Sequence, residues 1–161
     1  MIVLVMGVAG VGKTTIGEAL AAALGARFID ADDYHPPENV AKMKAGIPLQ
    51  DADRWPWLQR LNRALREEAN AVLACSALKE AYRRRLGEGV TDFKVVFLHA
   101  TPELIRERMK MRQHRYMPPA LLDSQLATLE PPTDAIAIDV AAPLADSIAA
   151  IVARLPSRSD L

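Results

Sequence analysis

Short, uninterrupted apolar runs alternate with longer stretches of mixed polarity along the chain. The runs are short enough to be buried strands, and in the stretches that follow them apolar residues recur every three or four positions, as on one face of a helix. This alternation predicts an α/β domain, in which helices cover both faces of a parallel sheet. The predicted strands cover residues 2–6, 26–30, 71–75, 93–98 and 135–139. The predicted helices cover residues 16–24, 37–44, 55–69, 77–86, 102–113, 120–129 and 143–155.

Residues at the ends of several predicted helices favour these boundaries. The polar segment 48–54 predicts a loop before the helix that begins at Trp55. Ser76 is a candidate N-cap for the helix that follows the third strand. Thr101 is a second candidate cap, and the proline and glutamate after it suit the first turn of a helix.

Length and composition favour a single domain that covers residues 1–161. Half of the residues are hydrophobic and a quarter are charged, which argues against a disordered chain and against a membrane protein. The 20 basic residues equal the 20 acidic residues, so no net field attracts nucleic acid. We therefore expect a small-molecule partner, and neither nucleic acid nor membrane.

The single cysteine and the apolar start of the chain bear on location. Cys75 has no second cysteine to pair with, which excludes an intrachain disulfide and a multi-cysteine metal site. The apolar start has no basic segment before it and no cleavage site after it, so we expect no signal peptide. The expected location is the cytoplasm.

The segment after the first predicted strand carries a phosphate-binding motif. Residues 7–14, GVAGVGKT, fit the pattern G-x-x-x-x-G-K-[ST] and stand between a predicted strand and a predicted helix. Glycines let successive N–H groups converge on phosphates, the helix adds its positive dipole end, and Lys13 adds a point charge. The alternative is a glycine-rich turn that happens to precede a helix. We predict that this phosphate loop binds ATP or GTP through Gly7, Gly10, Val11, Gly12, Lys13, Thr14 and Thr15.

Two acidic residues stand at the end of the second predicted strand. The carboxyl ends of parallel strands meet at one edge of the sheet, so Asp30 and Asp32 should share a crevice with the phosphate loop. Phosphoryl transfer to a hydroxyl needs a carboxylate base and a Mg²⁺-bound nucleotide. We predict that Asp32 is the catalytic base. We predict that Thr14 ligates Mg²⁺ and that Asp30, on the same side of an extended chain as Asp32, is an outer-shell partner of the ion. Turn chemistry or helix capping is the alternative for the two acids.

The densest basic run lies at the end of one predicted helix and enters a break before the next. Such a segment can close over ATP as a lid, here over about residues 106–120. We predict that Arg108 and Arg112 bind ATP and that Arg112 is catalytic, while Arg115 stays an open candidate. A solvated helix face is the alternative.

Longer stretches of the chain resemble the gluconokinases, and the resemblance covers nearly the whole chain in the family's order. Many kinases share the phosphate loop, but three stretches taken together are specific. They are HP, PL-x-D-x-DR-x-PWL and CSALK-x-x-YR, which begin here at His35, Pro48 and Cys75. Further matching residues are Asn39, Lys42, Met43, Arg108, Arg112, Leu121, Leu122, Ser124, Gln125, Leu129, Glu130 and Asp139.

The resemblance implies phosphorylation of D-gluconate by ATP at the 6-hydroxyl, which yields 6-phosphogluconate. It implies the three-layer P-loop kinase fold with sheet order 2-3-1-4-5, a small helical lid and, commonly, a homodimer. It also implies a substrate-binding segment over about residues 33–60. A sugar acid needs cations for its carboxylate and polar groups for its hydroxyls. The implied substrate contacts are Asp32, His35, Arg54, Lys79 and Arg83, of which the residue pattern by itself leaves His35 and Arg54 open.

Two segments depart from the family's pattern. Ala31 stands where the family usually has glycine before the catalytic aspartate. In the lid, residues 114–117 read HRYM where the family has a Gly-His-aromatic-aromatic pattern. We therefore carry no catalytic role to His114.

Two other functions stay open. A kinase for another small acceptor, such as shikimate or a nucleoside monophosphate, would use the same phosphate machinery with a different segment after residue 33. A regulatory ATP-binding protein would need no base at Asp32, and it would bind ATP without releasing ADP in response to an acceptor.

Overall fold

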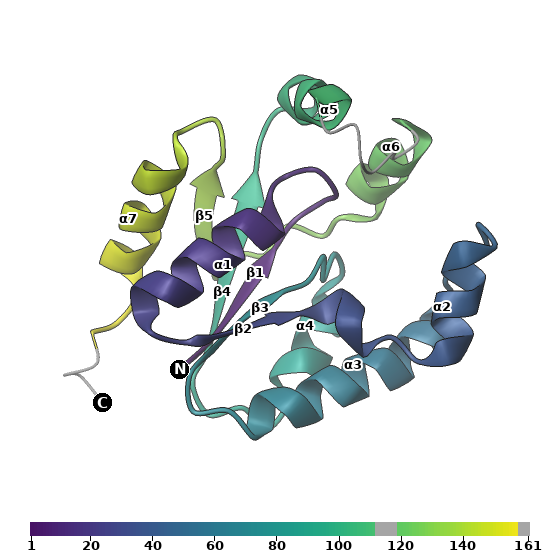
Figure 1. Ribbon diagram of the computed structural model, residues 1–161, viewed down its shortest axis with the longest axis horizontal. Coiled ribbons are helices and arrows are strands. Elements are labelled where there is room, and N and C mark those ends of the chain that lie inside the picture. Colours follow the sequence, from purple (N-terminus) through teal and green to yellow (C-terminus); the bar gives the residue numbers. More distant parts are fainter. Residues whose placement is uncertain (112–118, 158–161) are drawn as a thin grey trace.

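Five parallel strands form the sheet at the centre of the molecule, in the order β2-β3-β1-β4-β5 (Figure 1). The computed structural model describes residues 1–111 and 119–157. The strands are β1 (Ile2–Met6), β2 (Arg27–Asp30), β3 (Ala71–Ala74), β4 (Phe93–His99) and β5 (Ile136–Asp139). The parallel sheet and its strand order confirm the sequence-based expectation.

Helices cover both faces of the sheet because β1 is apolar on both sides. Ile2, Leu4 and Met6 of β1 pack into one core with α3 (Asp51–Arg66) and α4 (Glu80–Gly87). The two intervening valines pack into a second core with α1 (Lys13–Leu24) and α7 (Leu144–Arg154). Successive side chains of a strand point to opposite faces, so one five-residue run supplies both cores.

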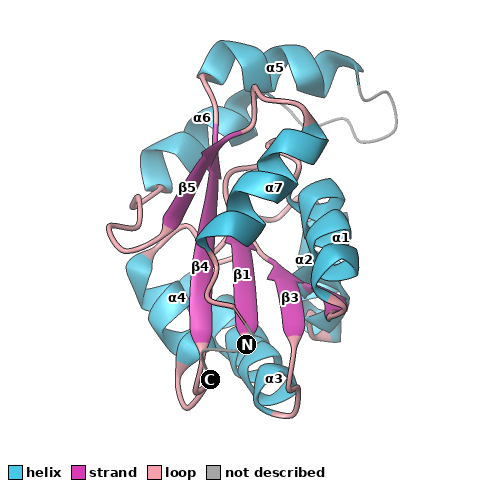
Figure 2. Ribbon diagram, turned by 90° about the vertical axis from the view of Figure 1, so that its left-hand side faces the viewer, coloured by secondary structure: helices cyan, strands magenta, loops and turns pink. Residues whose placement is uncertain are grey.

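Two helices lie beyond the carboxyl ends of the strands. They are α5 (Pro102–Met111) and α6 (Pro119–Thr128), and both views place them at the opposite end of the molecule from the N-terminus (Figures 1 and 2). A third core joins them to the loops that follow β1 and β3, with Ile105 of α5 and Leu122 of α6 packed against Val8 and Leu78. After β2 the chain forms a short 3₁₀ helix, η1 (Ala31–Tyr34), and then α2 (Pro37–Lys44).

The start of α3 corrects the sequence-based boundary. Residues 51–54 belong to the helix rather than to a loop. The Gln50 side chain accepts from the backbone of Asp53, and the Asp53 carboxylate accepts from the N–H of Gln50 at 2.9 Å. These polar residues form a capping box, so the loop predicted over residues 48–54 is wrong from residue 51 onward.

The Ser76 cap is wrong, whereas the Thr101 cap is confirmed. Helix α4 begins at Glu80, with Lys79 at its N-cap. Before it, Ala77 adopts a φ of 44°, so the chain turns in a loop before it can begin a helix. Thr101 Oγ1 accepts from the N–H of Leu104 at 3.2 Å, as an N-cap should.

Among the residues described, no helix combines the length and the apolar character needed to cross a lipid bilayer.

The hydrogen bonds of Asn62 connect α3 to the end of α4, and a substitution at this position tests their contribution to stability. The Asn62 side chain is buried and donates to the carbonyls of Leu86 at 2.8 Å and Glu88 at 2.7 Å. Asn62→Leu leaves both carbonyls without this donor, so we expect a loss of about 1–3 kcal/mol in the free energy of unfolding, measured by urea denaturation. The control Arg63→Leu, at an exposed neighbouring position, should stay within about 0.5 kcal/mol of the wild type. Equal effects in the two variants would contradict the assignment.

Candidate active site

The phosphate loop joins β1 to α1 and has a backbone that its glycines allow. Gly10 has a φ of 83° and Gly12 a φ of 96°, both in the left-handed region. A Cβ on Gly10 would lie 2.7 Å from Cγ of Met109, so α5 approaches the loop closely here. Gly12 is the N-cap of α1 and has no side chain to cap it, and the first turn holds no acidic residue. The first N–H groups of the helix are therefore free of a side-chain cap and suit an anion.

Lys13 lies within this loop. Its Nζ donates to the carbonyl of Val8 at 3.1 Å. Burial lowers the pKa of Lys13 to about 8, and the negative charges of Asp32 and Asp30 offset part of that effect. The sequence expectation that these acids and the phosphate loop share one edge of the sheet agrees with this electrostatic contact.

Asp30 and Asp32 are arranged differently from the sequence-based expectation. The strand ends at Asp30, whose Oδ1 accepts from the N–H of Asp32 at 3.0 Å and caps η1. The two residues therefore do not lie on one side of an extended chain, and the capping alternative applies to Asp30. The side chain of Asp32 is 76% exposed, and its Oδ1 lies 3.8 Å from Nε2 of His35.

His35 is held rigidly beside Asp32. Its ring stacks on Trp57 with centroids 4.2 Å apart, and its side chain is only 4% exposed. Asn39 Nδ2 lies 3.2 Å from His35 Nδ1 and donates to the carbonyl of Asp53 at 2.9 Å. An amide donor at Nδ1 assigns the proton of the neutral ring to Nε2, the nitrogen nearest Asp32. Burial lowers the pKa of His35, which favours this neutral form.

Asp51 and Arg54 of α3, Lys79 at the N-cap of α4 and Tyr82 of α4 form a polar cluster, which we call the Asp51 cluster. Tyr82 donates its hydroxyl to the Asp51 carboxylate, Arg54 lies 3.4 Å from Oδ1, and Lys79 lies 4.0 Å from Oδ2. The hydrogen bond from Tyr82 is the largest cause that lowers the pKa of Asp51, and the two cations add to it. Burial and the bond to Asp51 raise the pKa of Tyr82 to about 12. The cluster brings together two of the predicted substrate contacts, Arg54 and Lys79.

Arg83 lies in the framework beside that cluster. Its guanidinium is buried and donates to the carbonyls of Ala77 at 2.7 Å, Leu78 at 3.1 Å and Glu130 at 2.7 Å. These bonds fix the loop that precedes α4. The substrate contact predicted for Arg83 stays a prediction.

The basic residues of the predicted lid are only partly described. Arg108, on α5, donates to the carbonyl of Val140 at 2.6 Å, beside the end of β5. Arg112, His114 and Arg115 lie outside the described residues, as does the whole connection from α5 to α6, residues 112–118.

The donor set at this edge suits Mg²⁺. Thr14 offers an exposed hydroxyl at the start of α1, and Asp30 offers a half-buried carboxylate. Oxygen ligands are those that Mg²⁺ prefers, and the ion usually keeps waters and binds nucleotide phosphates as well. In residues 1–111 and 119–157, no three His, Cys, Asp or Glu side chains converge to hold a metal ion.

Two residues, Asn39 and Tyr82, hold site residues in place, a role that no sequence pattern predicts for them. Asn39 and Tyr82 were only members of matching stretches, yet Asn39 orients His35, and Tyr82 holds Asp51. Their fixed spacing from His35 and Lys79 was the available signal. What each side chain contacts depends on the packing of α2, α3 and α4, so the stretches by themselves did not reveal it.

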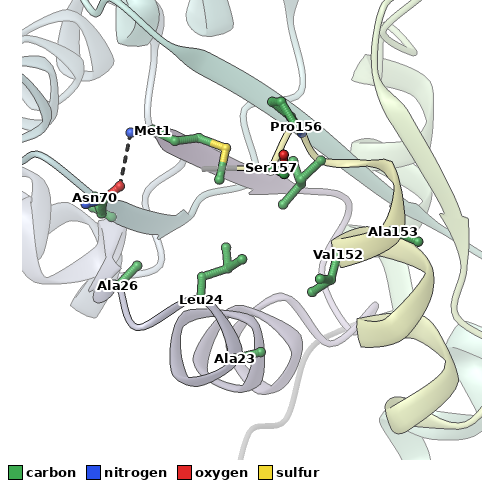
Figure 3. A pocket seen from close by; sticks show the side chains of 11 residues that line it. Met1, Ala23, Leu24, Ala26, Asn70, Val152, Ala153, Pro156 and Ser157 are labelled. Atoms are coloured by element: carbon green, nitrogen blue, oxygen red, sulfur yellow. Dashed lines mark hydrogen bonds between the residues drawn. The ribbon is translucent and has the colours of Figure 1, made fainter. Parts of the chain in front are cut away.

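A cavity of about 470 Å³ lies away from these groups (Figure 3). Its lining includes Met1 and Ala26, which precede β1 and β2, together with Val152 of α7. It therefore opens at the amino ends of the strands, opposite the phosphate loop. It shares no lining residue with the candidate active site.

Comparisons with known proteins agree with this geometry. The chain matches the AAA domain family over residues 2–132. It is 48% identical to a probable gluconokinase of Xenopus tropicalis, over 87% of this chain and 85% of the relative. The crystal structure of a gluconokinase from Sinorhizobium meliloti superposes with a TM-score of 0.86 at 46% identity, covering 94% of this chain and 89% of that one. A shikimate kinase from Bacteroides thetaiotaomicron, 19% identical with a TM-score of 0.71 over 96% of this chain and 99% of its own, shares the fold.

Proposed function

Because the chain belongs to the gluconokinase family, we propose that it transfers the γ-phosphoryl group of ATP to the 6-hydroxyl of D-gluconate. The products are 6-phospho-D-gluconate and ADP. One observation carries the proposal: the glycine loop with Lys13 and the exposed carboxylate of Asp32 occupy the same edge of the sheet. A loop for the donor phosphates and a base for the acceptor are the two requirements of this reaction.

Asp32 is the proposed general base. Its carboxylate accepts the proton of the 6-hydroxyl as the oxygen attacks the γ-phosphorus, and the bond to the leaving ADP oxygen breaks. Asp32 is exposed and therefore open to an acceptor, while His35 lies fixed at 3.8 Å. The Nε2–H of His35 faces the Asp32 carboxylate, where it can orient that carboxylate or an acceptor hydroxyl bound beside it, which makes His35 a proposed substrate contact.

The Asp51 cluster is the proposed site for the gluconate carboxylate. Arg54 and Lys79 are both partly exposed and both lie beside the carboxylate of Asp51. A carboxylate ligand that approaches these two cations replaces part of their contact with Asp51. Cations paired with a carboxylate form shorter and stronger hydrogen bonds than neutral groups do.

The phosphate loop is the proposed binding site for the ATP phosphates. The N–H groups from Gly10 to Thr15 and the ammonium of Lys13 meet the phosphates. Thr14 and Asp30 hold Mg²⁺, directly or through water, and the ion neutralises phosphate charge when it is bound. Met109 of α5 packs on Gly10, and Arg108, its neighbour on the same helix, donates to the carbonyl of Val140. We assign Arg108 and Arg112 to the nucleotide, with Arg112 meeting the transferring group.

The assembly, the location and the absence of a nucleic-acid partner stay predictions. The resemblance implies a homodimer. The single cysteine and the apolar start indicate the cytoplasm, and the balanced charge argues against nucleic acid.

Acceptor-dependent release of ADP tests the proposed function. The purified protein is assayed with Mg-ATP and D-gluconate, related sugar acids, shikimate or nucleoside monophosphates, against a blank without acceptor. We expect strong stimulation by D-gluconate. Stimulation by another acceptor alone would overturn the substrate assignment, and ATP binding without stimulation by any acceptor would favour a regulatory protein.

Asp32→Asn tests the catalytic base, with Asp33→Asn as the matched control. The amide cannot accept the hydroxyl proton, so we expect kcat to fall at least about a hundredfold. Binding of ATP, measured by calorimetry, should be unchanged. Asp33 is an adjacent exposed acid, and its variant should keep most of the activity. A similar kcat for Asp32→Asn and the wild type would remove Asp32 from the chemistry.

Lys13 should make ATP binding depend on pH. The pKa of Lys13 is about 8 in the empty site, and bound phosphates favour the charged form. ATP affinity should therefore be full below pH 8 and weaken above it, by at most about tenfold per pH unit. Calorimetry from about pH 7 to about pH 9.5, a range that brackets the pKa of Lys13, measures this trend. The Lys13→Ala variant should bind more weakly at every pH and lose the trend; an equally steep trend in that variant would assign it to another group.

A further inference from the structure

The carboxyl-terminal part of α6 contacts both halves of the candidate active site. Gln125 contacts the phosphate loop, and Glu130, just after the helix, contacts the segment that leads into α4. We call residues 125–130 the α6 strap. Within it, the N–H of Leu129 donates to the carbonyl of Gln125 at 2.9 Å, so the two contact points are held at a fixed separation.

On the nucleotide side, Gln125 Oε1 accepts from the N–H of Ala9 at 2.7 Å. Ala9 lies in the middle of the phosphate loop and is 5% exposed, and Gln125 is half-buried. The bond joins residues 116 positions apart. A buried N–H without a partner is costly, so this acceptor stabilises the loop conformation in which Ala9 points toward α6.

On the acceptor side, Glu130 makes three hydrogen bonds. Its N–H donates to the carbonyl of Leu78 at 2.8 Å, and its carbonyl accepts from Arg83 at 2.7 Å. Its carboxylate accepts from the N–H of Glu80 at 2.8 Å, at the first turn of α4. Lys79, a member of the Asp51 cluster, lies inside the segment that these bonds hold.

We propose that Gln125 is a positioning residue for phosphoryl transfer, because it fixes the phosphate loop to the strap that also holds the acceptor side. It acts through the Ala9 amide and contacts neither reactant. The neutral amide suits this role, since a carboxylate at the same place would bring negative charge to a loop that binds phosphates. The inference rests on the phosphate loop binding ATP, as proposed above.

Gln125→Met is the test, because methionine has a similar length and volume but lacks the oxygen. Loss of one such hydrogen bond should raise the Kd and the KM for ATP about fivefold. The KM for gluconate should be unchanged. Ser124→Ala, at the exposed neighbouring position, is the matched control and should leave all three constants at wild-type values.

Glu130→Ala provides the opposite case. It removes the acceptor at the start of α4, so the KM for gluconate should rise and the KM for ATP should not. A purely structural role for the strap predicts that both variants lower the melting temperature and raise both KM values together. That outcome would overturn the proposal, and so would wild-type ATP constants in a folded Gln125→Met protein.

Hydrogen exchange in the wild-type protein keeps the proposal testable if Gln125→Met does not fold. The Ala9 amide should exchange far more slowly than a free loop amide, as followed by NMR in the absence of nucleotide. Exchange at the free-loop rate would overturn the proposal. Failure of the wild-type protein to bind ATP would instead overturn the proposed function, so the two failures are distinguishable.

Discussion

The buried central strand β1 ends directly in the phosphate loop, and the rest of the site is arranged around that junction. Because β1 packs on both faces, neither the strand nor the first turn of α1 can shift without disturbing a core. The parallel sheet then brings the end of β2, with Asp30 and Asp32, to the same edge. The topology thus places a rigid phosphate-binding loop and a carboxylate side by side at the carboxyl ends of the strands. This is the edge at which open α/β sheets bind ligands.

Charge is distributed unevenly over this edge. Lys13 is held in a low-dielectric loop that lowers its pKa to about 8, whereas Arg54 and Lys79 stay partly exposed around Asp51. The first arrangement favours a ligand with high negative charge, because such a ligand restores the protonated ammonium. In the second arrangement, the carboxylate of Asp51 offsets the repulsion between Arg54 and Lys79. An anionic ligand could take over part of that role. The two arrangements suit a nucleotide polyphosphate and a sugar-acid carboxylate respectively.

Helices α5 and α6 extend the framework beyond the sheet. Ile105 and Leu122 pack with Val8 and Leu78 in a small separate core. The two helices therefore pack on the loops at the strand ends rather than on the sheet. The Gln125 to Ala9 bond and the Glu130 bonds add polar connections to that core. The α6 strap therefore has one polar contact on the nucleotide side, at Ala9, and a separate one on the acceptor side, at Glu80.

The sequence by itself determined the α/β class, the five strands, the phosphate loop and the placement of Asp32 beside it. These features depend on local patterns, namely apolar periodicity, a glycine motif and residues at strand ends. Local patterns are weaker at helix starts, where the predictions of a loop at residues 51–54 and of a cap at Ser76 are wrong. The sheet order and the substrate contacts came only with the resemblance to gluconokinases. Only the tertiary structure decided that Asp30 caps η1, that Arg83 binds backbone carbonyls and that Gln125 reaches Ala9. Partners of polar side chains are chosen by the packing of whole elements, and residues 116 positions apart leave no local pattern that could reveal their contact.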